Sequence, residues 1–153
     1  MARASYMCDR LIVAIGQNRE KQTMFSIDER IGMLCDVIDT SRADGALGPA
    51  VIEVAAFDGL LADFAKKCGV NVILKGLRAV SDFEFEFQMA LLNKYLDEKL
   101  ETVFLMTSVQ YTYLSSSAVK EIAVNGGRLD GLVPACVNKR IQSKLIYMKG
   151  MGK

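Results

Sequence analysis

The sequence contains no histidine, no tryptophan and only two prolines among its 153 residues. Without histidine, the chain has neither the most frequent general acid–base of enzymes nor the usual nitrogen ligand of zinc. No Cys-x-x-Cys pair occurs either, so the sequence predicts no metal-ligand cluster. We interpret the four separate cysteines as buried thiols of a protein from a reducing cytoplasm: Cys8, Cys35, Cys68 and Cys136.

Long apolar runs and a strong charge imbalance are also absent. No run reaches the ~20 residues that a membrane helix needs, and the charged start lacks the apolar core of a signal peptide. Nineteen basic residues stand against eighteen acidic ones, with both signs interspersed. Since a nucleic acid or an acidic membrane attracts a basic face, we expect no such partner. The composition favours small-molecule chemistry in the cytoplasm.

Short apolar runs alternate with helical patterns along the whole chain. The runs expected to be strands are 11–15, 51–56, 72–74 and 103–106. Helical patterns are expected at 26–38, 60–65, 82–96, 115–124 and after Pro134. This alternation predicts an α/β fold, doubly wound around a mostly parallel sheet. Because no linker or repeat interrupts it, we expect a single domain over residues 1–153.

Several local signals set the expected boundaries. Ser26 and Glu29 have the spacing of a capping box, and Asp82 is the expected N-cap of the longest helix. Residues 39–49 are rich in Gly, Asp and Ser and should form a surface loop. The apolar positions of the longest helix should form its core face: Phe83, Phe87, Ala90 and Leu91.

A basic, glycine-containing turn is expected after the strand at 72–74. Lys75 and Arg78 flank Gly76 there. Because the carboxyl ends of parallel strands hold ligands in α/β sheets, two cations beside bare backbone indicate a phosphate site. The alternative is that both cations are solvated loop charges.

Three serines at 115–117 open a later helical pattern. A serine cap and the free N–H groups of a helix N-terminus attract anions. This segment therefore predicts a second anion site.

These motifs occur in a familiar order. Lys-Gly-Leu-Arg-Ala-Val-x-Asp-Phe-Glu-x-Glu-x-Gln-Met-Ala begins at Lys75, and Leu-Ser-Ser-Ser-x-Val-Lys-Glu begins at Leu114. Together with Lys21, which precedes Met24-Phe25, they resemble the bacterial phosphopantetheine adenylyltransferase family over about Arg3 to Leu145. The resemblance implies the nucleotidyltransferase variant of the Rossmann-like sheet. It also implies adenylyl transfer from ATP to 4′-phosphopantetheine, with Mg²⁺, in a homohexamer.

The resemblance also implies residue roles. Lys21 is expected to bind the acceptor phosphate and to act in catalysis, with Leu61 and Lys75 as further substrate contacts. The expected ATP contacts are Gly76, Leu77, Arg78, Glu86, Tyr111, Thr112, Tyr113, Leu114, Ser115, Ser116 and Ser117. Three of these assignments have a plain alternative, since Leu61 and Tyr113 suit packing and Glu86 suits a solvated surface.

The chain departs from the family at its start. It lacks the family's first strand, the following Gly-Thr-Phe-Asp-Pro turn and the Gly-His pair with the catalytic histidine. In the family that strand is central, so its loss should leave two rows of unpaired backbone groups. We expect a natural chain that starts upstream. The alternative is a true short form whose sheet another segment or subunit repairs.

Two other functions fit the same motifs. A non-catalytic homologue that senses nucleotide or coenzyme A would keep the phosphate-binding residues and lack the histidine. A nucleotidyltransferase for another acceptor, such as nicotinamide mononucleotide or glycerol phosphate, would share the serine-capped helix.

Overall fold

The computed structural model describes residues 1–17, 23–78 and 80–151. They fall into two compact units, which are described one at a time. The first unit comprises Met1–Val13, Met24–Val54 and Leu114–Lys153, and the second comprises Ala14–Thr23 and Ala55–Tyr113. The expectation of one domain over residues 1–153 stays a prediction.

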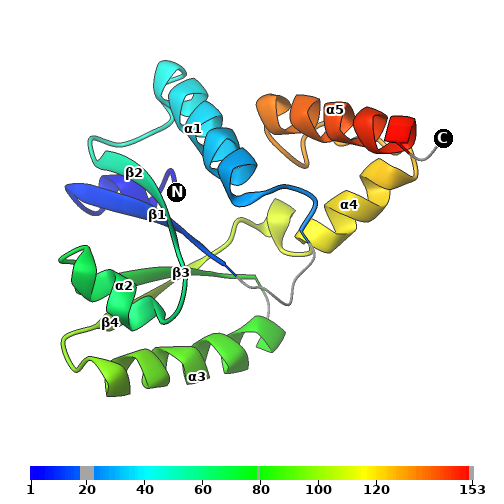
Figure 1. The fold of residues 1–153 in the computed structure, drawn as a ribbon. Helices are drawn as coiled ribbons and strands as arrows, with labels where there is room; N and C mark the ends of the chain where they lie inside the picture. The colour runs from blue at the N-terminus through cyan, green and yellow to red at the C-terminus, as the bar shows by residue number, and fades with distance from the viewer. Residues whose placement is uncertain (18–22, 79, 152–153) are drawn as a thin grey trace. The chain divides into compact units, whose positions relative to one another are not determined.

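Strands and helices alternate along the chain, as the sequence predicted (Figure 1). The strands are β1 (Arg10–Gly16), β2 (Val51–Phe57), β3 (Val72–Leu77) and β4 (Glu101–Met106). The helices are α1 (Ile27–Ala43), α2 (Leu61–Lys67), α3 (Val80–Leu96), α4 (Ser116–Val124) and α5 (Ala135–Met151), with 3-10 turns η1 (Ala4–Tyr6) and η2 (Val109–Tyr111). The α/β class is thereby confirmed.

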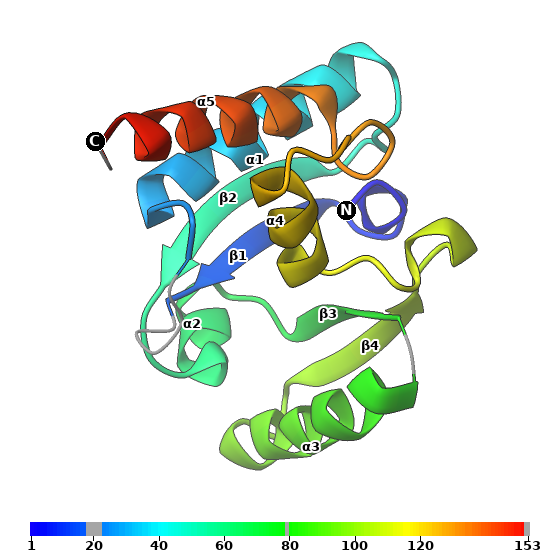
Figure 2. The ribbon, with the colours of Figure 1, turned by 90° about the vertical axis from the view of Figure 1, so that its right-hand side faces the viewer.

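The described strands form two separate sheets, β1–β2 and β3–β4. β3 and β4 are parallel, with a register that runs from Val72 opposite Glu101 to Leu77 opposite Met106. β1 and β2 also run in parallel, as their arrowheads show in Figure 2. No described strand joins the two sheets, so the inner strand that the family resemblance implies has no counterpart among these residues.

One edge of β3 is left without a partner strand in the described part of the chain. The carbonyls of Asn71 and Leu77 accept from the N–H groups of Glu101 and Thr107 on the β4 side. In a parallel ladder the backbone groups of successive residues point to opposite sides. The N–H and C=O groups that face away from β4 therefore belong to Val72, Leu74 and Gly76.

α1 starts where the sequence predicted and ends later. Ser26 Oγ accepts from the Glu29 N–H, and the Glu29 carboxylate accepts from the Ser26 N–H, which completes the capping box. The expected loop at 39–49 is wrong in its first residues, because the helix continues to Ala43. Residues 39–44 contain neither glycine nor proline, and the first glycine after them, Gly45, has a φ of 67°.

The core of the second unit lies between α2 and β3. It is formed by Ala62, Ala65, Ile73 and Leu100, with Leu61 and Val70 packed against it. Phe57 and Phe64 stack beside it with ring centroids 4.8 Å apart. Gly69 ends α2 in the left-handed region with a φ of 65°, as its position predicted.

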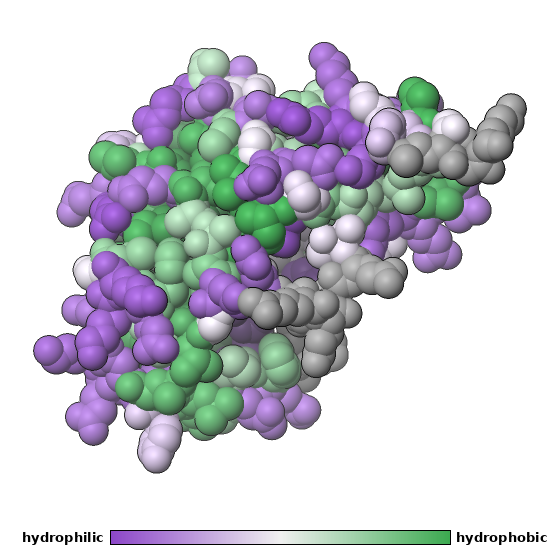
Figure 3. Space-filling model, in the orientation of Figure 1, coloured by the Kyte–Doolittle hydropathy of each residue, from purple (hydrophilic) through white to green (hydrophobic). Residues whose placement is uncertain are grey.

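α3 differs from its sequence prediction in two ways. It begins at Val80, so Asp82 lies inside the helix and is not its N-cap. The predicted core face is largely exposed, since Phe83, Phe87 and Leu91 keep 45%, 46% and 55% of their accessible surface. The small β3–β4 sheet cannot cover the helix. The rings of Phe83 and Phe104 still pack edge to face, with centroids 6.2 Å apart. Figure 3 shows apolar surface over this helix.

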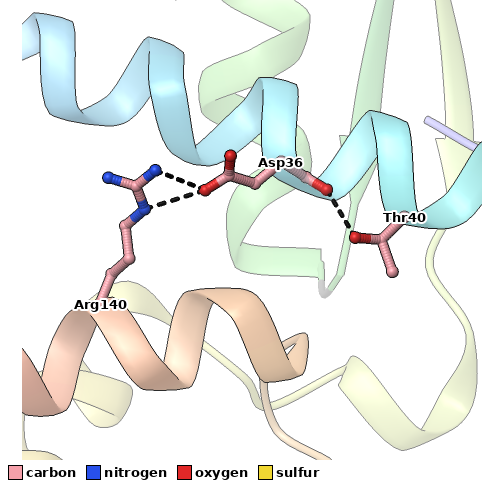
Figure 4. Close-up of polar contacts among 3 residues, drawn as sticks. All are labelled: Asp36, Thr40 and Arg140. Atoms are coloured by element: carbon pink, nitrogen blue, oxygen red, sulfur yellow. Dashed lines mark hydrogen bonds and ion pairs between the residues drawn. The ribbon is translucent and has the colours of Figure 1, made fainter.

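The first unit contains a second core and, among the described residues, two ion pairs between α1 and α5, Arg140–Asp36 and Lys144–Glu29. Buried Val119, Ala123, Leu129 and Ile141 form that core. Arg140 donates to Asp36 Oδ2 through both Nε and Nη2, at 2.9 and 2.5 Å (Figure 4).

The four cysteines are free thiols, as the sequence predicted, but the expectation that they are buried was wrong. Cys35 is exposed, and Cys8, Cys68 and Cys136 are all partly exposed. No described helix combines the length and the low charge that a membrane span requires.

Candidate phosphate-binding site

The basic segment after residue 74 is strand rather than turn. The sequence placed Lys75, Gly76 and Leu77 beyond the strand, but β3 continues to Leu77 because its carbonyl still accepts from the Thr107 N–H at 2.9 Å. Arg78 is the first residue beyond it. The expected turn is therefore wrong at three of its four residues, which belong to β3.

Gly76 is a glycine that the described fold does not require. A Cβ at this position would meet no atom within 4 Å, and its φ lies outside the left-handed region. Its backbone points to the edge of β3 without a partner strand. A residue without a side chain at an open edge lets a ligand approach the backbone closely.

Lys75 and Glu86 lie together in the second unit. Lys75 Nζ is 3.2 Å from Glu86 Oε2, and their side chains are 32% and 22% exposed. Glu86 Oε2 itself is buried and accepts no hydrogen bond from the described residues. The Lys75 ammonium is thus close enough to form an ion pair with Glu86, but its orientation does not make a hydrogen bond. The alternative that Glu86 is a solvated surface residue does not fit this geometry.

Two of the expected ligand contacts have side chains engaged in packing. Leu61 packs against the core of the second unit, and Leu77 is 6% exposed. This favours the packing alternative for Leu61. Leu77 can offer a ligand little beyond its backbone.

Residues 111–113 present polar and aromatic side chains at the surface of the second unit. Tyr111 closes η2, and Thr112 Oγ1 donates to the Val109 carbonyl at 2.8 Å. Tyr113 keeps 79% of its surface exposed, so the packing alternative for this ring does not hold in the described structure.

The serine segment starts α4 in the first unit. Ser115 is the N-cap, and its Oγ accepts from the Ala118 N–H at 3.1 Å. Ser116 and Ser117 are exposed in the first turn. Leu114 packs against the core of the first unit. The helix start, which the sequence predicted, presents the free N–H groups that an anion needs.

The predicted site residues divide between the units. The second unit holds Leu61, Lys75, Gly76, Leu77, Arg78, Glu86, Tyr111, Thr112 and Tyr113, and the first holds Leu114, Ser115, Ser116 and Ser117. Lys21 lies outside the described residues.

Sequence reasoning missed a hollow between the start of α1 and α5. It has a volume of about 600 Å³ and is lined by Phe25, Glu29, Lys139, Arg140, Ser143, Lys144 and Tyr147. Lys144 Nζ donates to Glu29 Oε1 at 2.6 Å and lies 5.8 Å from the Phe25 ring. The hydrogen bond from Lys144 lowers the pKa of Glu29, and a second hydrogen bond, from the Ser26 N–H, lowers it further. The only sequence feature that could have indicated this hollow is the spacing of the basic residues on α5.

No group of three or more acidic, cysteine or histidine side chains that could hold a metal occurs among the described residues. They therefore do not fit a metal site made by protein ligands alone.

Comparisons with known proteins identify the family of the chain. Residues 1–122 match the cytidylyltransferase-like family model. A phosphopantetheine adenylyltransferase of Clostridium botulinum (strain Langeland) is 48% identical over 147 residues, covering 96% of this chain and 85% of the relative. One of Desulfosudis oleivorans is 44% identical over 146 residues, covering 95% and 82%. The chain therefore belongs to the phosphopantetheine adenylyltransferase family of cytidylyltransferase-like nucleotidyltransferases.

Proposed function

We propose that this chain transfers the adenylyl group of ATP to 4′-phosphopantetheine in coenzyme A biosynthesis. The observation that carries the proposal is near 48% identity to phosphopantetheine adenylyltransferases over 96% of the chain. An oxygen of the acceptor phosphate attacks the α-phosphorus of ATP. The bond from that phosphorus to the β-phosphate oxygen breaks, and pyrophosphate leaves with dephospho-coenzyme A as the other product.

This reaction asks the protein mainly to position two polyanions and to neutralise developing charge. Lys75 and Lys21 are proposed to bind the acceptor phosphate. Gly76, whose backbone faces an open edge, and Arg78 are proposed to approach the ATP phosphates. The start of α4 offers backbone N–H groups to the same kind of anion.

Mg²⁺ is the proposed cofactor, and the described residues provide no cluster of ligands for it. Mg²⁺ is often bound through substrate phosphates, with few protein carboxylates. It is therefore proposed to enter with ATP and to neutralise phosphate charge, while the chain contributes cations and N–H groups.

A non-catalytic sensor of nucleotide or coenzyme A is the second candidate, because it would use the same proposed phosphate-binding residues. The test measures pyrophosphate release from ATP with 4′-phosphopantetheine, beside calorimetric titration of ATP alone. Acceptor-dependent release supports adenylyl transfer. ATP binding without any release supports the sensor, and release only with nicotinamide mononucleotide or glycerol phosphate indicates a different acceptor.

A homo-oligomer, with a hexamer as the expected form, is also proposed. α3 exposes large apolar side chains, of which Phe85 keeps 63% of its surface and Tyr95 85%. Contiguous exposed apolar surface often marks a protein interface. Light scattering of Phe85→Ser should show smaller particles than the unchanged protein. Equal particle sizes would contradict the role of this face.

A further inference from the structure

The Lys75–Glu86 ion pair joins two residues proposed for different substrates. Lys75 is proposed for the acceptor phosphate, and Glu86 for ATP. In the described structure, Lys75 Nζ lies 3.2 Å from Glu86 Oε2, which accepts no hydrogen bond from another described residue. The two proposed ligand contacts are therefore partners of one another.

This pairing conflicts with acceptor binding. If Lys75 turned to a phosphate, a buried carboxylate oxygen would lose its cation, which is unfavourable. If the phosphate joined the existing pair, two anions would share one ammonium at close range. In both cases Glu86 opposes binding of the acceptor phosphate by Lys75.

Binding of ATP can remove the conflict. A carboxylate only accepts hydrogen bonds, and the groups of ATP that donate them are its ribose hydroxyls and its adenine amino group. Such donors would satisfy Glu86 in place of Lys75. The 22% exposure of Glu86 and the 32% exposure of Lys75 leave both side chains within reach of a ligand.

We propose that Glu86 is a positioning residue that couples the two substrates by holding Lys75 until ATP takes over the Glu86 carboxylate. Lys75 then turns to the acceptor phosphate. This inference rests on the proposed adenylyl transfer. Coupling of this kind is reciprocal and amounts to on the order of ten-fold in affinity.

The experiment is calorimetric titration of 4′-phosphopantetheine into the unchanged protein and into Glu86→Gln. Each titration is done alone and with ATP whose α,β-bridging oxygen is replaced by methylene, which blocks transfer. The analogue should tighten acceptor binding to the unchanged protein by on the order of ten-fold. Glu86→Gln should bind the acceptor more tightly than the unchanged protein when no nucleotide is present, and the analogue should add little.

A gain of affinity separates this role from a structural one, because damage to the fold weakens binding. Lys94 and Glu101 provide the matched control, since they form a lysine–glutamate pair in the same unit at an exposed position. Glu101→Gln should behave like the unchanged protein in all titrations.

Three results would overturn the inference. The first is an acceptor affinity of the unchanged protein that the analogue does not alter, which needs no variant and is independent of how well Glu86→Gln folds. The second is a folded Glu86→Gln that binds the acceptor no more tightly than the unchanged protein. Both leave adenylyl transfer standing. The third, an unchanged protein that binds neither ligand, rejects the proposed function as well.

Discussion

Ser115 Oγ accepts a hydrogen bond from the Ala118 N–H at 3.1 Å and so caps α4. Its neighbours Ser116 and Ser117 make no side-chain hydrogen bond to other described residues. The three serines look equivalent in the sequence, but only Ser115 stabilises the start of α4 through its side chain. Their substitutions should separate stability from ligand binding.

Ser115→Ala should destabilise the protein by ~1 kcal/mol, because a helix N-cap is lost. Ser116→Ala and Ser117→Ala should leave the free energy of unfolding nearly unchanged and weaken ATP binding. Urea denaturation and ATP titration of the three variants measure the two effects. Equal loss of stability in all three would contradict the assignment of the cap to Ser115.

Gly76→Ala should keep or raise stability and lower the affinity for ATP. The new methyl group meets no described atom, and the variant restricts the unfolded chain, which typically stabilises by ~0.4–1 kcal/mol. The methyl group would stand where the phosphates are proposed to approach. Thermal unfolding with and without ATP measures both effects.

Gly127→Ala is the control for Gly76. Its Cβ would lie 2.7 Å from Ile122 Cγ2, so this variant should lose stability where Gly76→Ala does not. Normal ATP binding by Gly76→Ala would contradict the proposal that the ATP phosphates approach the Gly76 backbone closely.

The Glu29–Lys144 pair should make stability depend on pH. The pKa of Glu29 is lowered mainly by the hydrogen bond from Lys144. A carboxyl whose pKa is lower in the folded state contributes stability above its unfolded pKa, and the contribution is lost as the pH falls through the folded pKa. Urea denaturation from neutral to acidic pH should show a smaller decline for Glu29→Gln, which cannot titrate.

Glu121→Gln on α4 is the matched control for this pH dependence. Its side chain is exposed in the same unit and makes no interaction with other described residues. This variant should keep the decline of the unchanged protein. An identical pH profile for Glu29→Gln would show that the pair contributes nothing.

Lys75→Ala should raise the KM for 4′-phosphopantetheine more than the KM for ATP. A charge-assisted contact is worth ~1.5–3 kcal/mol, which corresponds to roughly ten- to a hundred-fold in affinity. Lys94→Ala, which removes an exposed lysine of the same unit, should change neither value. Initial rates at varied concentrations of each substrate measure the split. An equal rise of both KM values would argue against a specific contact with the acceptor.

Local chemistry made parts of the fold predictable from the sequence. The capping box of Ser26 and Glu29, the cap at Ser115 and the left-handed Gly69 depend on neighbours within a few residues. The start of α4 at the serine segment was therefore predicted correctly. The Lys75–Glu86 pair was not foreseen, because it depends on how α3 lies against β3.

Burial was the least predictable property. Phe83 and Leu91 have the spacing of a core face, but a helix face is buried only where another layer covers it. The same reason explains the exposure of Cys35. The end of β3 was missed since its last residues depend on pairing with β4, which periodicity does not reveal.

The open edge of β3 divides its amide protons into two interleaved sets. Those of Ile73, Lys75 and Leu77 face β4, whereas those of Val72, Leu74 and Gly76 have no described strand opposite them. In deuterated water the second set should exchange faster than the first. Slower exchange of the second set alone would therefore show that a further strand has paired with the open edge of β3.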